Sequence, residues 1–245
     1  MIRVLTIERE YGSGGGEIAA ALAKRLDWKL YDQLLTTEIA RLMDCDCRVV
    51  EERGEKKDPL FHRLMMAFMR GSHEGSLNAP RLKLADADCI REVTERVVKH
   101  AAERGQCVIV GRGSAYYLQG RKDTFHVFIY ASIEDKVRRL KAAGKTETEA
   151  IQLAETVDRD RAAFIKKYFG VDWPDRQRFN LMINSSAGLD AVIETILNGI
   201  RLCDKKSLAG KSLACSPPSE NQSNPQPSSV QERASQSTPG PISPV

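Results

Sequence analysis

The sequence predicts an α/β fold with a parallel, doubly wound sheet, and two observations carry this prediction. Short apolar runs alternate along the chain with segments whose apolar residues recur at helical spacing. The run CVIV at residues 107–110 is apolar throughout, which is typical of a central parallel strand covered on both faces. Strands that are separated by helices join in parallel, so the alternation itself indicates the type of sheet.

The first expected elements surround a glycine-rich segment. Residues 4–7 are a strand candidate that ends just before the glycines. The helix after the glycines is indicated by apolar residues spaced four apart on one face, namely Ile18, Leu22 and Leu26. A second strand is expected over residues 28–31, and a second helix over about 33–42.

Capping residues define the later elements. Gly105 closes a helix expected over about 84–104, and Thr146 with Glu149 forms a capping box that opens a helix toward Tyr168. The other expected elements are strands over 125–130 and 181–184, a helix through Ala142 and a closing helix over 189–202. Ligands of such sheets bind beyond the carboxyl ends of the strands. The candidate site therefore lies at the glycines, at Asp32 and at residues 111–113.

Composition and charge limit the kinds of partner. The net charge of +4 is mild, so nucleic acid is not expected as a partner, and an anionic small molecule is equally compatible. The longest apolar runs are far shorter than the ~20 residues that span a bilayer, so no membrane is expected. No secretory signal begins the chain, and the six scattered cysteines indicate reduced thiols in the cytoplasm. Cys45 and Cys47 lack a second pair that would complete a zinc site.

The chain is expected to divide into a folded unit over residues 1–206 and a disordered tail over residues 207–245. From Ser207 onward the sequence is rich in proline and serine and holds no aromatic residue. Such a composition cannot bury enough apolar surface to offset the entropy of ordering. The sequence does not identify a partner of this tail.

Residues 9–19 read REYGSGGGEIA and predict an anion site between the first strand and the first helix. Backbone amides at a helix start bind anions, and glycines let phosphate oxygens approach the backbone closely. A dinucleotide-binding pattern fits Gly12 and Gly14, with Asp32 at the right distance, but Glu17 stands at its third glycine.

A mononucleotide P-loop pattern also fits in part. Gly15 then stands where the pattern requires lysine, and Gly16 stands where it requires a hydroxyl group. Arginines elsewhere favour phosphoryl transfer: Arg112 follows the third strand, and Arg159 and Arg161 lie on the helix that Thr146 opens. Phosphoryl transfer needs several cations around a charge that spreads over many oxygens, whereas hydride transfer does not.

With these motifs in order, the sequence resembles the cytidylate kinase-like family of P-loop nucleoside monophosphate kinases. The resemblance covers nearly all of the folded unit and rests on TIEREYGSGG at 6–15, IVGRG at 109–113, VDRDRAA at 157–163 and LMINSS at 181–186. It implies a three-layer P-loop NTPase fold with a five-stranded parallel sheet. It also implies transfer of the ATP γ-phosphoryl group to CMP or dCMP, assisted by Mg²⁺.

The resemblance assigns roles to particular residues. The loop residues would bind the ATP phosphates: Gly12, Ser13, Gly14, Gly15 and Gly16. Arg112 and Asp32 would bind the acceptor nucleotide, and Arg159 and Arg161 would contact the phosphates from a lid over about 146–178. An acceptor-binding insertion is implied over about residues 53–81.

Three departures from the family pattern concern charge. Gly15 stands where true cytidylate kinases have the P-loop lysine, Gly16 where members commonly have arginine, and Gly113 where an acid follows Arg112. Arg9 lies on the same loop, and we hypothesise that it supplies the missing cation. The departures leave a catalytically weakened nucleotide-binding or regulatory protein of the same fold as an alternative. A dinucleotide-binding protein is the third alternative.

Overall fold

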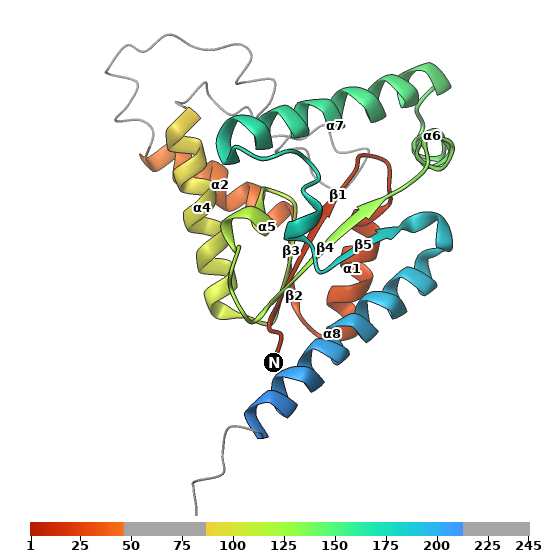
Figure 1. The fold of residues 1–245 in the computed structure, drawn as a ribbon. Coiled ribbons are helices and arrows are strands. Elements are labelled where there is room, and N and C mark those ends of the chain that lie inside the picture. The colour runs from red at the N-terminus through yellow and green to blue at the C-terminus, as the bar shows by residue number, and fades with distance from the viewer. Residues whose placement is uncertain (47–86, 213–245) are drawn as a thin grey trace, which may run out of the picture.

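A five-stranded sheet with the strand order β2-β3-β1-β4-β5 forms the centre of the structure (Figure 1), a computed structural model that describes residues 1–46 and 87–212. The strands are β1 (Val4–Arg9), β2 (Lys29–Tyr31), β3 (Cys107–Val110), β4 (Thr124–Tyr130) and β5 (Leu181–Asn184). Every neighbouring pair is parallel. The predicted five-stranded parallel sheet is therefore confirmed.

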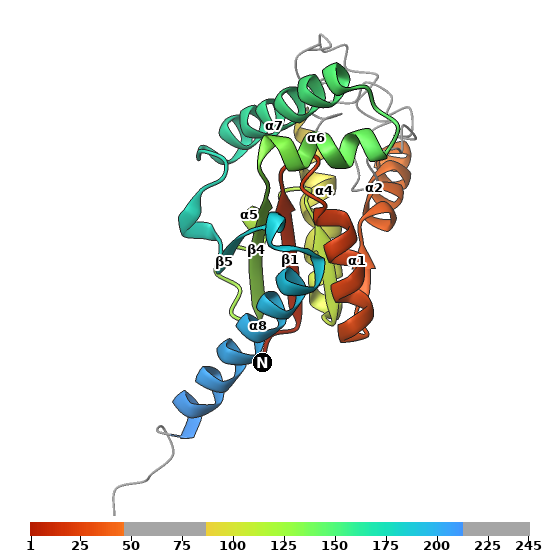
Figure 2. The same cartoon turned by 90° about the vertical axis from the view of Figure 1, so that its right-hand side faces the viewer.

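Helices cover both faces of the sheet and its carboxyl edge (Figures 1 and 2). They are α1 (Gly15–Leu26), α2 (Gln33–Asp46), α4 (Ala87–Arg104), α5 (Ser114–Tyr117), α6 (Ile133–Ala142), α7 (Glu147–Phe169) and α8 (Leu189–Ser212). One face packs against α1 and α8, the other against α2, α4 and α5, and α7 crosses above the strand ends. No helix in the described part of the chain combines the length and apolar character needed to cross a membrane.

The two faces of the sheet bury different side chains. The face under α1 and α8, called the α1–α8 face below, is mainly aliphatic, with residues such as Leu5, Ile7 and Leu22. The face under α2, α4 and α5, called the α2–α4 face, also buries Tyr116 and Phe164. Half-buried aromatic residues surround that second cluster: Tyr31, Tyr117, Tyr168, Phe169, Trp173 and Phe179.

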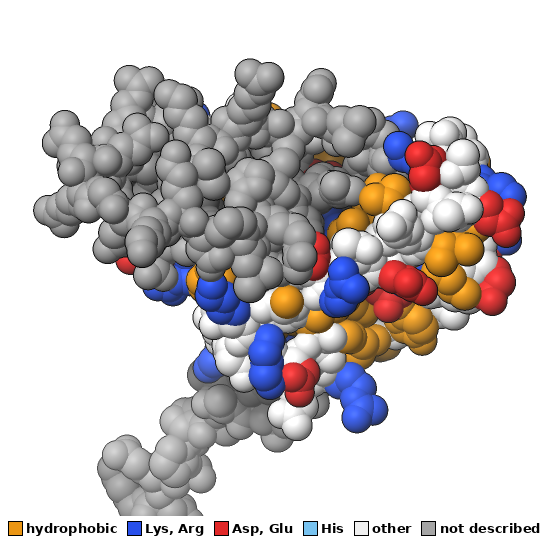
Figure 3. Space-filling model, turned by 90° about the horizontal axis from the view of Figure 1, so that it is seen from above, with side chains coloured by type: hydrophobic (Ala, Val, Ile, Leu, Met, Phe, Trp, Pro, Cys, Tyr) orange, Lys and Arg blue, Asp and Glu red, His pale blue; other side chains and the backbone are white. Residues whose placement is uncertain are grey.

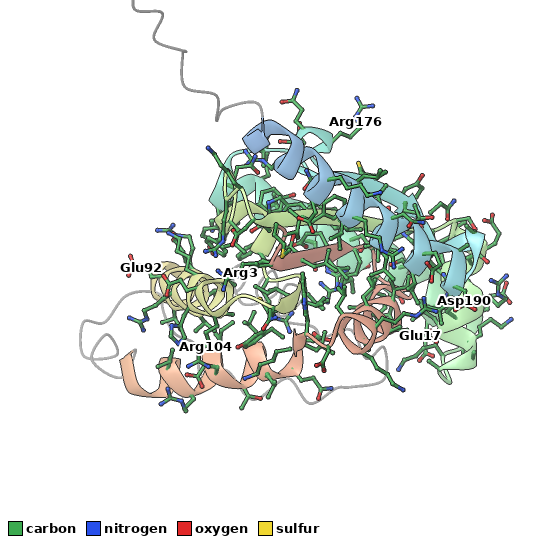
Figure 4. The ribbon with its side chains drawn as sticks, turned by 90° about the horizontal axis from the view of Figure 1, so that it is seen from below. Arg3, Glu17, Glu92, Arg104, Arg176 and Asp190 are labelled. Carbon is green, nitrogen blue, oxygen red and sulfur yellow. The ribbon has the colours of Figure 1, made fainter. Side chains whose placement is uncertain are left out.

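Local sequence signals explain where the later helices begin and end. The Thr146 side chain accepts a hydrogen bond from Glu149 N, and the Glu149 side chain accepts one from Thr146 N, so the predicted capping box is present. Gly105 follows α4 with a φ of 67°, a conformation that glycine adopts without steric cost. At the lower edge of the sheet, Arg3 Nη2 donates to the carbonyl of Arg104 at 3.3 Å and caps the end of α4 (Figure 4).

Several boundaries differ from those expected. The helix α8 runs to Ser212, past the expected end of the closing helix at 202, because Leu208, Ala209 and Lys211 are good helix formers. Likewise α2 continues to Asp46, and the short elements α5, Arg176–Arg178 and Ser185–Ala187 have no periodicity that would predict them. The expected acceptor-binding insertion over 53–81 and the tail beyond Ser212 lie outside the described residues.

Candidate active site

The last two residues of β1 point to opposite faces of the sheet. Side chains alternate along a strand, and Leu5 and Ile7 belong to the core of the α1–α8 face. Arg9 therefore falls on the side of α1, whereas Glu8 falls on the side of α5 and accepts a hydrogen bond from the backbone of Ala115. Both side chains are only 4% exposed. The end of β1 therefore places one buried charged side chain on each face of the sheet.

The glycine loop joins β1 to α1 through a sharply turned backbone. Gly12 has a φ of 79° and Gly14 a φ of 75°, values that a residue with a Cβ adopts only with strain. Gly14 is the N-cap of α1 and offers no capping side chain. The first amide groups of α1 are then available to a ligand, because a helix start has no intrahelical acceptors for them. Ser13 does not face a ligand but donates from Oγ to the carbonyl of Glu10 at 2.8 Å.

Arg9 lies directly against this loop. A Cβ added to Gly15 would lie 2.7 Å from Arg9 Cβ and 2.9 Å from Arg9 Cγ. A Cβ added to Gly111, at the end of β3, would collide with Arg9 Nη1. The Arg9 side chain therefore runs from the first turn of α1 to the end of the neighbouring strand.

The turn after β3 aims a second arginine into the protein. Gly111, Arg112 and Gly113 all have positive φ angles, of 63°, 58° and 66°. Arginine seldom adopts this conformation, which costs on the order of 1–2 kcal/mol and is found mostly at functional sites. Arg112 is only 1% exposed. The strained turn buries its guanidinium rather than presenting it to solvent.

Three arginines share this buried region, because Arg161 of α7 is also only 4% exposed. Burial lowers the pKa of Arg112 to about 9, with the charge of Arg9 acting in the same direction. Burial and the charge of Arg9 likewise lower the pKa of Arg161 to about 10. A bound anion would act in the opposite direction and raise these pKa values again.

Acidic side chains lie close to these arginines. Burial raises the pKa of Glu8, while the charges of Arg9, Arg161 and Arg112 oppose that rise. Its Oε1 atom has no hydrogen-bond partner among residues 1–46 and 87–212. Asp32, half-buried after β2, raises the pKa of Arg112 through its charge and so lies on the same side of the site.

The helix α7 is held down on the glycine loop by direct contacts. Arg161 Nη1 donates to the carbonyl of Arg9 at 2.9 Å and pairs with Asp158 Oδ1 at 3.3 Å. The same Asp158 oxygen accepts from the backbone N–H of Tyr11 at 2.8 Å. One turn of α7 therefore binds both the end of β1 and the start of the loop.

Two cations of α6 complete the contacts around the loop. Lys136, whose side chain is 11% exposed, pairs with Glu10 at 2.8 Å and with Asp158 at 3.1 Å. Burial opposes its charge, but the hydrogen bond and charge of Glu10 and the charge of Asp158 raise its pKa overall. Arg139 donates to the carbonyl of Gly12 at 3.5 Å and to that of Ser185 at 3.3 Å. The loop is thus enclosed by basic side chains from α6 and α7.

The structure brings most of the predicted site residues together at the carboxyl edge of the sheet. Arg9, Arg112 and Arg161 converge beside the glycine loop, with Asp32 near Arg112. Arg159 does not join them: it is exposed on α7, outside this cluster, so its catalytic role stays a prediction.

Figure 3 looks down on the carboxyl edge from above. On this face, beside the grey residues, the lysine and arginine side chains of the described residues are interspersed with acidic and hydrophobic ones. The arginines of the site are buried beneath this surface, since Arg9, Arg112 and Arg161 are each at most 4% exposed.

A parallel sheet in this strand order, a glycine loop that opens the first helix and a helix across the strand ends define a P-loop kinase fold. The profile of the cytidylate kinase-like family matches residues 4–187, and the chain belongs to that family. A cytidylate kinase from Methanosarcina mazei is 26% identical over 183 residues, which are 74% of this chain and 86% of that protein.

Among solved structures, an uncharacterized protein from Eubacterium ventriosum has a similar fold. Its TM-score is 0.57 at 21% sequence identity, and the match covers 82% of this chain and 99% of that chain. The three-layer P-loop fold that the sequence predicts is confirmed.

The sequence alone did not identify Glu8, Lys136, Arg139 and Asp158 as parts of the site. Each contacts the loop or the arginine cluster in the structure. A partial signal existed for Asp158, because it precedes Arg161 by three residues and therefore shares a helical face with it. Glu8 could have been found by continuing the alternation of β1 to its last residues.

Proposed function

We propose that this protein transfers the γ-phosphoryl group of ATP to CMP or dCMP. The observation that supports this most directly is the buried cluster of Arg9, Arg112 and Arg161 beside a glycine loop. Phosphoryl transfer is catalysed mainly by positioning and by cations that stabilise charge on the phosphoryl oxygens. Three buried guanidinium groups next to a set of helix-start amides provide this environment.

In this proposal the glycine loop binds the phosphates of ATP. The residues from Gly12 to Gly16 supply backbone amides and no side chain that would hinder a phosphate oxygen, apart from the inward-turned Ser13. The positive end of the α1 dipole adds to the attraction. Arg161 lies above the loop on α7, where it would stabilise charge on the transferring group.

The acceptor nucleotide would bind at the ends of β2 and β3. Arg112 would bind its phosphate through two parallel hydrogen bonds, the geometry for which a guanidinium group is suited. Asp32 would bind the nucleoside part or orient Arg112, whose charge it supports.

Mg²⁺ would enter together with ATP. Within residues 1–46 and 87–212, no three His, Cys, Asp or Glu side chains gather into a group that could hold a metal ion. Magnesium is usually bound by substrate phosphates, water and one or two carboxylates rather than by a protein cage, so the site fits a metal carried by the substrate. Glu17, exposed in the first turn of α1, is the candidate carboxylate. When bound, the ion would neutralise charge on the β- and γ-phosphates.

The test is an assay of the full chain with ATP, Mg²⁺ and each of CMP, dCMP, UMP, AMP and GMP, in which ADP formation is followed. We expect turnover with CMP or dCMP and a loss of about a hundredfold or more in Arg112→Ala. Arg25→Ala is the matched control, because Arg25 is exposed at the far end of α1. Equal turnover in Arg112→Ala and Arg25→Ala would contradict the assignment of the acceptor site.

A second function is supported by the missing lysine at Gly15. In that alternative the protein binds nucleotides but transfers phosphate weakly or not at all, and it acts by binding. Stabilisation of the protein by ATP without ADP formation for any acceptor would favour this alternative. The family match gives no support to a dinucleotide-binding protein.

A further inference from the structure

The glycines of the loop are needed for two different reasons. At Gly12 and Gly14 the backbone requires glycine, because their φ angles are 79° and 75°. Gly15 has no positive φ and is already the first residue of α1. The backbone at position 15 would therefore accept any helical residue.

What excludes a side chain at Gly15 is Arg9. The Cβ of any other residue would lie 2.7 Å from Arg9 Cβ, a distance that real Cβ atoms essentially never show. The atoms in the way belong to the root of the Arg9 side chain, which cannot swing aside while the backbone of β1 stays in place. The conflict is therefore between residues 9 and 15. They lie six positions apart, as do the first glycine and the lysine of the P-loop pattern.

We propose that Arg9 supplies the cation of this phosphate loop in place of a lysine at position 15, and that the loop has room for only one of the two. Position 9 is where the P-loop pattern has its first glycine, and position 15 is where it has lysine. The chain carries the reverse arrangement, with the side chain at 9 and glycine at 15. This inference rests on the proposed function for the identity of the ligand, a nucleoside triphosphate.

The path of Arg9 gives it a wider role than a lysine would have. Its Cβ and Cγ pack on Gly15 in the donor loop, while Nη1 lies against Gly111, next to the strained Arg112. The guanidinium is therefore placed between the donor loop and the acceptor edge. A guanidinium has five donors in a rigid fork and can contact oxygens of two groups, whereas a lysine ammonium acts as a single point charge.

The test is a set of five full-length variants, three single and two double, assayed for ATP binding by thermal shift with Mg²⁺ and for turnover with CMP. Arg9→Gln should weaken ATP binding about tenfold, the loss expected from one charged hydrogen bond. Gly15→Ala should also weaken it, although alanine favours helices. When Gly15→Ala is added to Arg9→Gly, ATP binding should not weaken further. When Gly15→Lys is added to Arg9→Gly, at least half of the loss in log Kd for ATP that Arg9→Gly causes should be recovered.

The outcomes separate this inference from the proposed function. Arg25→Gln serves as the control for loss of an arginine charge and should bind ATP as the wild type does. If no acceptor is phosphorylated but the five variants bind ATP as stated, the inference holds and the kinase proposal fails. If Arg9→Gln binds ATP and turns over like Arg25→Gln, or if Gly15→Lys gives no recovery in Arg9→Gly, the inference fails whatever the activity. Unfolding curves without ATP show which variants are folded, and Arg9→Gln retains the stem that packs on Gly15.

Discussion

The two faces of the sheet are built from different kinds of interaction. The α1–α8 face is held mainly by aliphatic residues of β1, α1 and α8 in continuous contact. The α2–α4 face combines aliphatic and aromatic packing with a buried polar pair, in which Thr6 Oγ1 lies 2.7 Å from His126 Nδ1. Apolar packing carries no pH dependence, whereas a buried titratable group does.

The strand β1 connects this difference to the site. Alternation along the strand sends Thr6 and then Glu8 to the α2–α4 face, and Ile7 and then Arg9 to the α1–α8 face. The α2–α4 face therefore leads to Glu8, and the α1–α8 face leads to Arg9 and the glycine loop. The core below the glycine loop consists of apolar residues that do not titrate.

The largest effect is expected from a cavity in the α1–α8 face. Leu22→Ala removes a fully buried side chain from α1 and should lower the free energy of unfolding by about 2–5 kcal/mol. Lys24 lies on the same helix and is exposed, so the control Lys24→Ala should change the free energy of unfolding by less than about 0.5 kcal/mol. Urea unfolding at pH 7 measures both. A loss below about 1 kcal/mol in Leu22→Ala would show that this face is not the rigid support described.

The α2–α4 face should show its buried histidine in the pH dependence of stability. Burial lowers the pKa of His126 from 6.5 to about 4, so the folded protein holds this residue neutral. Between those pH values the unfolded chain binds a proton that the folded chain does not. Stability should therefore fall by about 1.4 kcal/mol for each pH unit between pH 6.5 and 4 on account of this residue.

The comparison with His126→Gln isolates that contribution. Glutamine does not titrate, so the variant should lose this part of the pH slope, even though its stability at pH 7 is lower. Urea unfolding at several pH values between 4 and 7 gives both slopes. Parallel curves for the two proteins would rule out a depressed pKa at His126.

The fold followed from the sequence because its signals are local. Apolar runs, helical periodicity and the capping box at Thr146 are each read within a few residues, and the structure confirms them. The helix α8 was expected to end at residue 202 but continues to Ser212, because apolar residues become sparse after Leu202 and the helical periodicity no longer marks the helix. The signal for the glycine loop is equally local, because the positive φ angles of Gly12 and Gly14 require glycine at these positions.

The site was only partly predictable, because most of its contacts join distant segments. Arg161 could be placed with the buried residues of α7 from helical phase, and the same phase leaves Arg159 on the exposed side. Lys136 and Arg139 contact the loop across more than a hundred residues of chain, and nothing in their neighbourhood marks them as special. Packing of α6 on the loop, which no local pattern encodes, decides their role.

A smaller effect is expected from Lys136, whose ion pairs lie at the carboxyl edge of the sheet. Lys136→Met removes the cation shared by Glu10 and Asp158 and leaves two acids close together. The side chain is mostly but not fully buried, so we expect a loss of about 2 kcal/mol, between the values for exposed and buried ion pairs. Because Asp158 also holds Tyr11, ATP binding should weaken with it. Urea unfolding and a thermal shift with ATP measure the two effects, and an unchanged ATP shift would separate Lys136 from the loop.

The smallest effect is expected from a second lysine of α6, which forms an ion pair at the surface. Lys141 Nζ lies 2.9 Å from Glu147 of α7, but the two side chains are 49% and 66% exposed. Water screens such a pair and its side chains lose entropy in forming it, so Lys141→Met should cost at most about 0.5 kcal/mol. Urea unfolding of Lys136→Met and Lys141→Met at low and high salt tests the contrast, since only the surface pair should vanish with salt. Equal losses in the two variants would mean that burial does not distinguish these two ion pairs of α6.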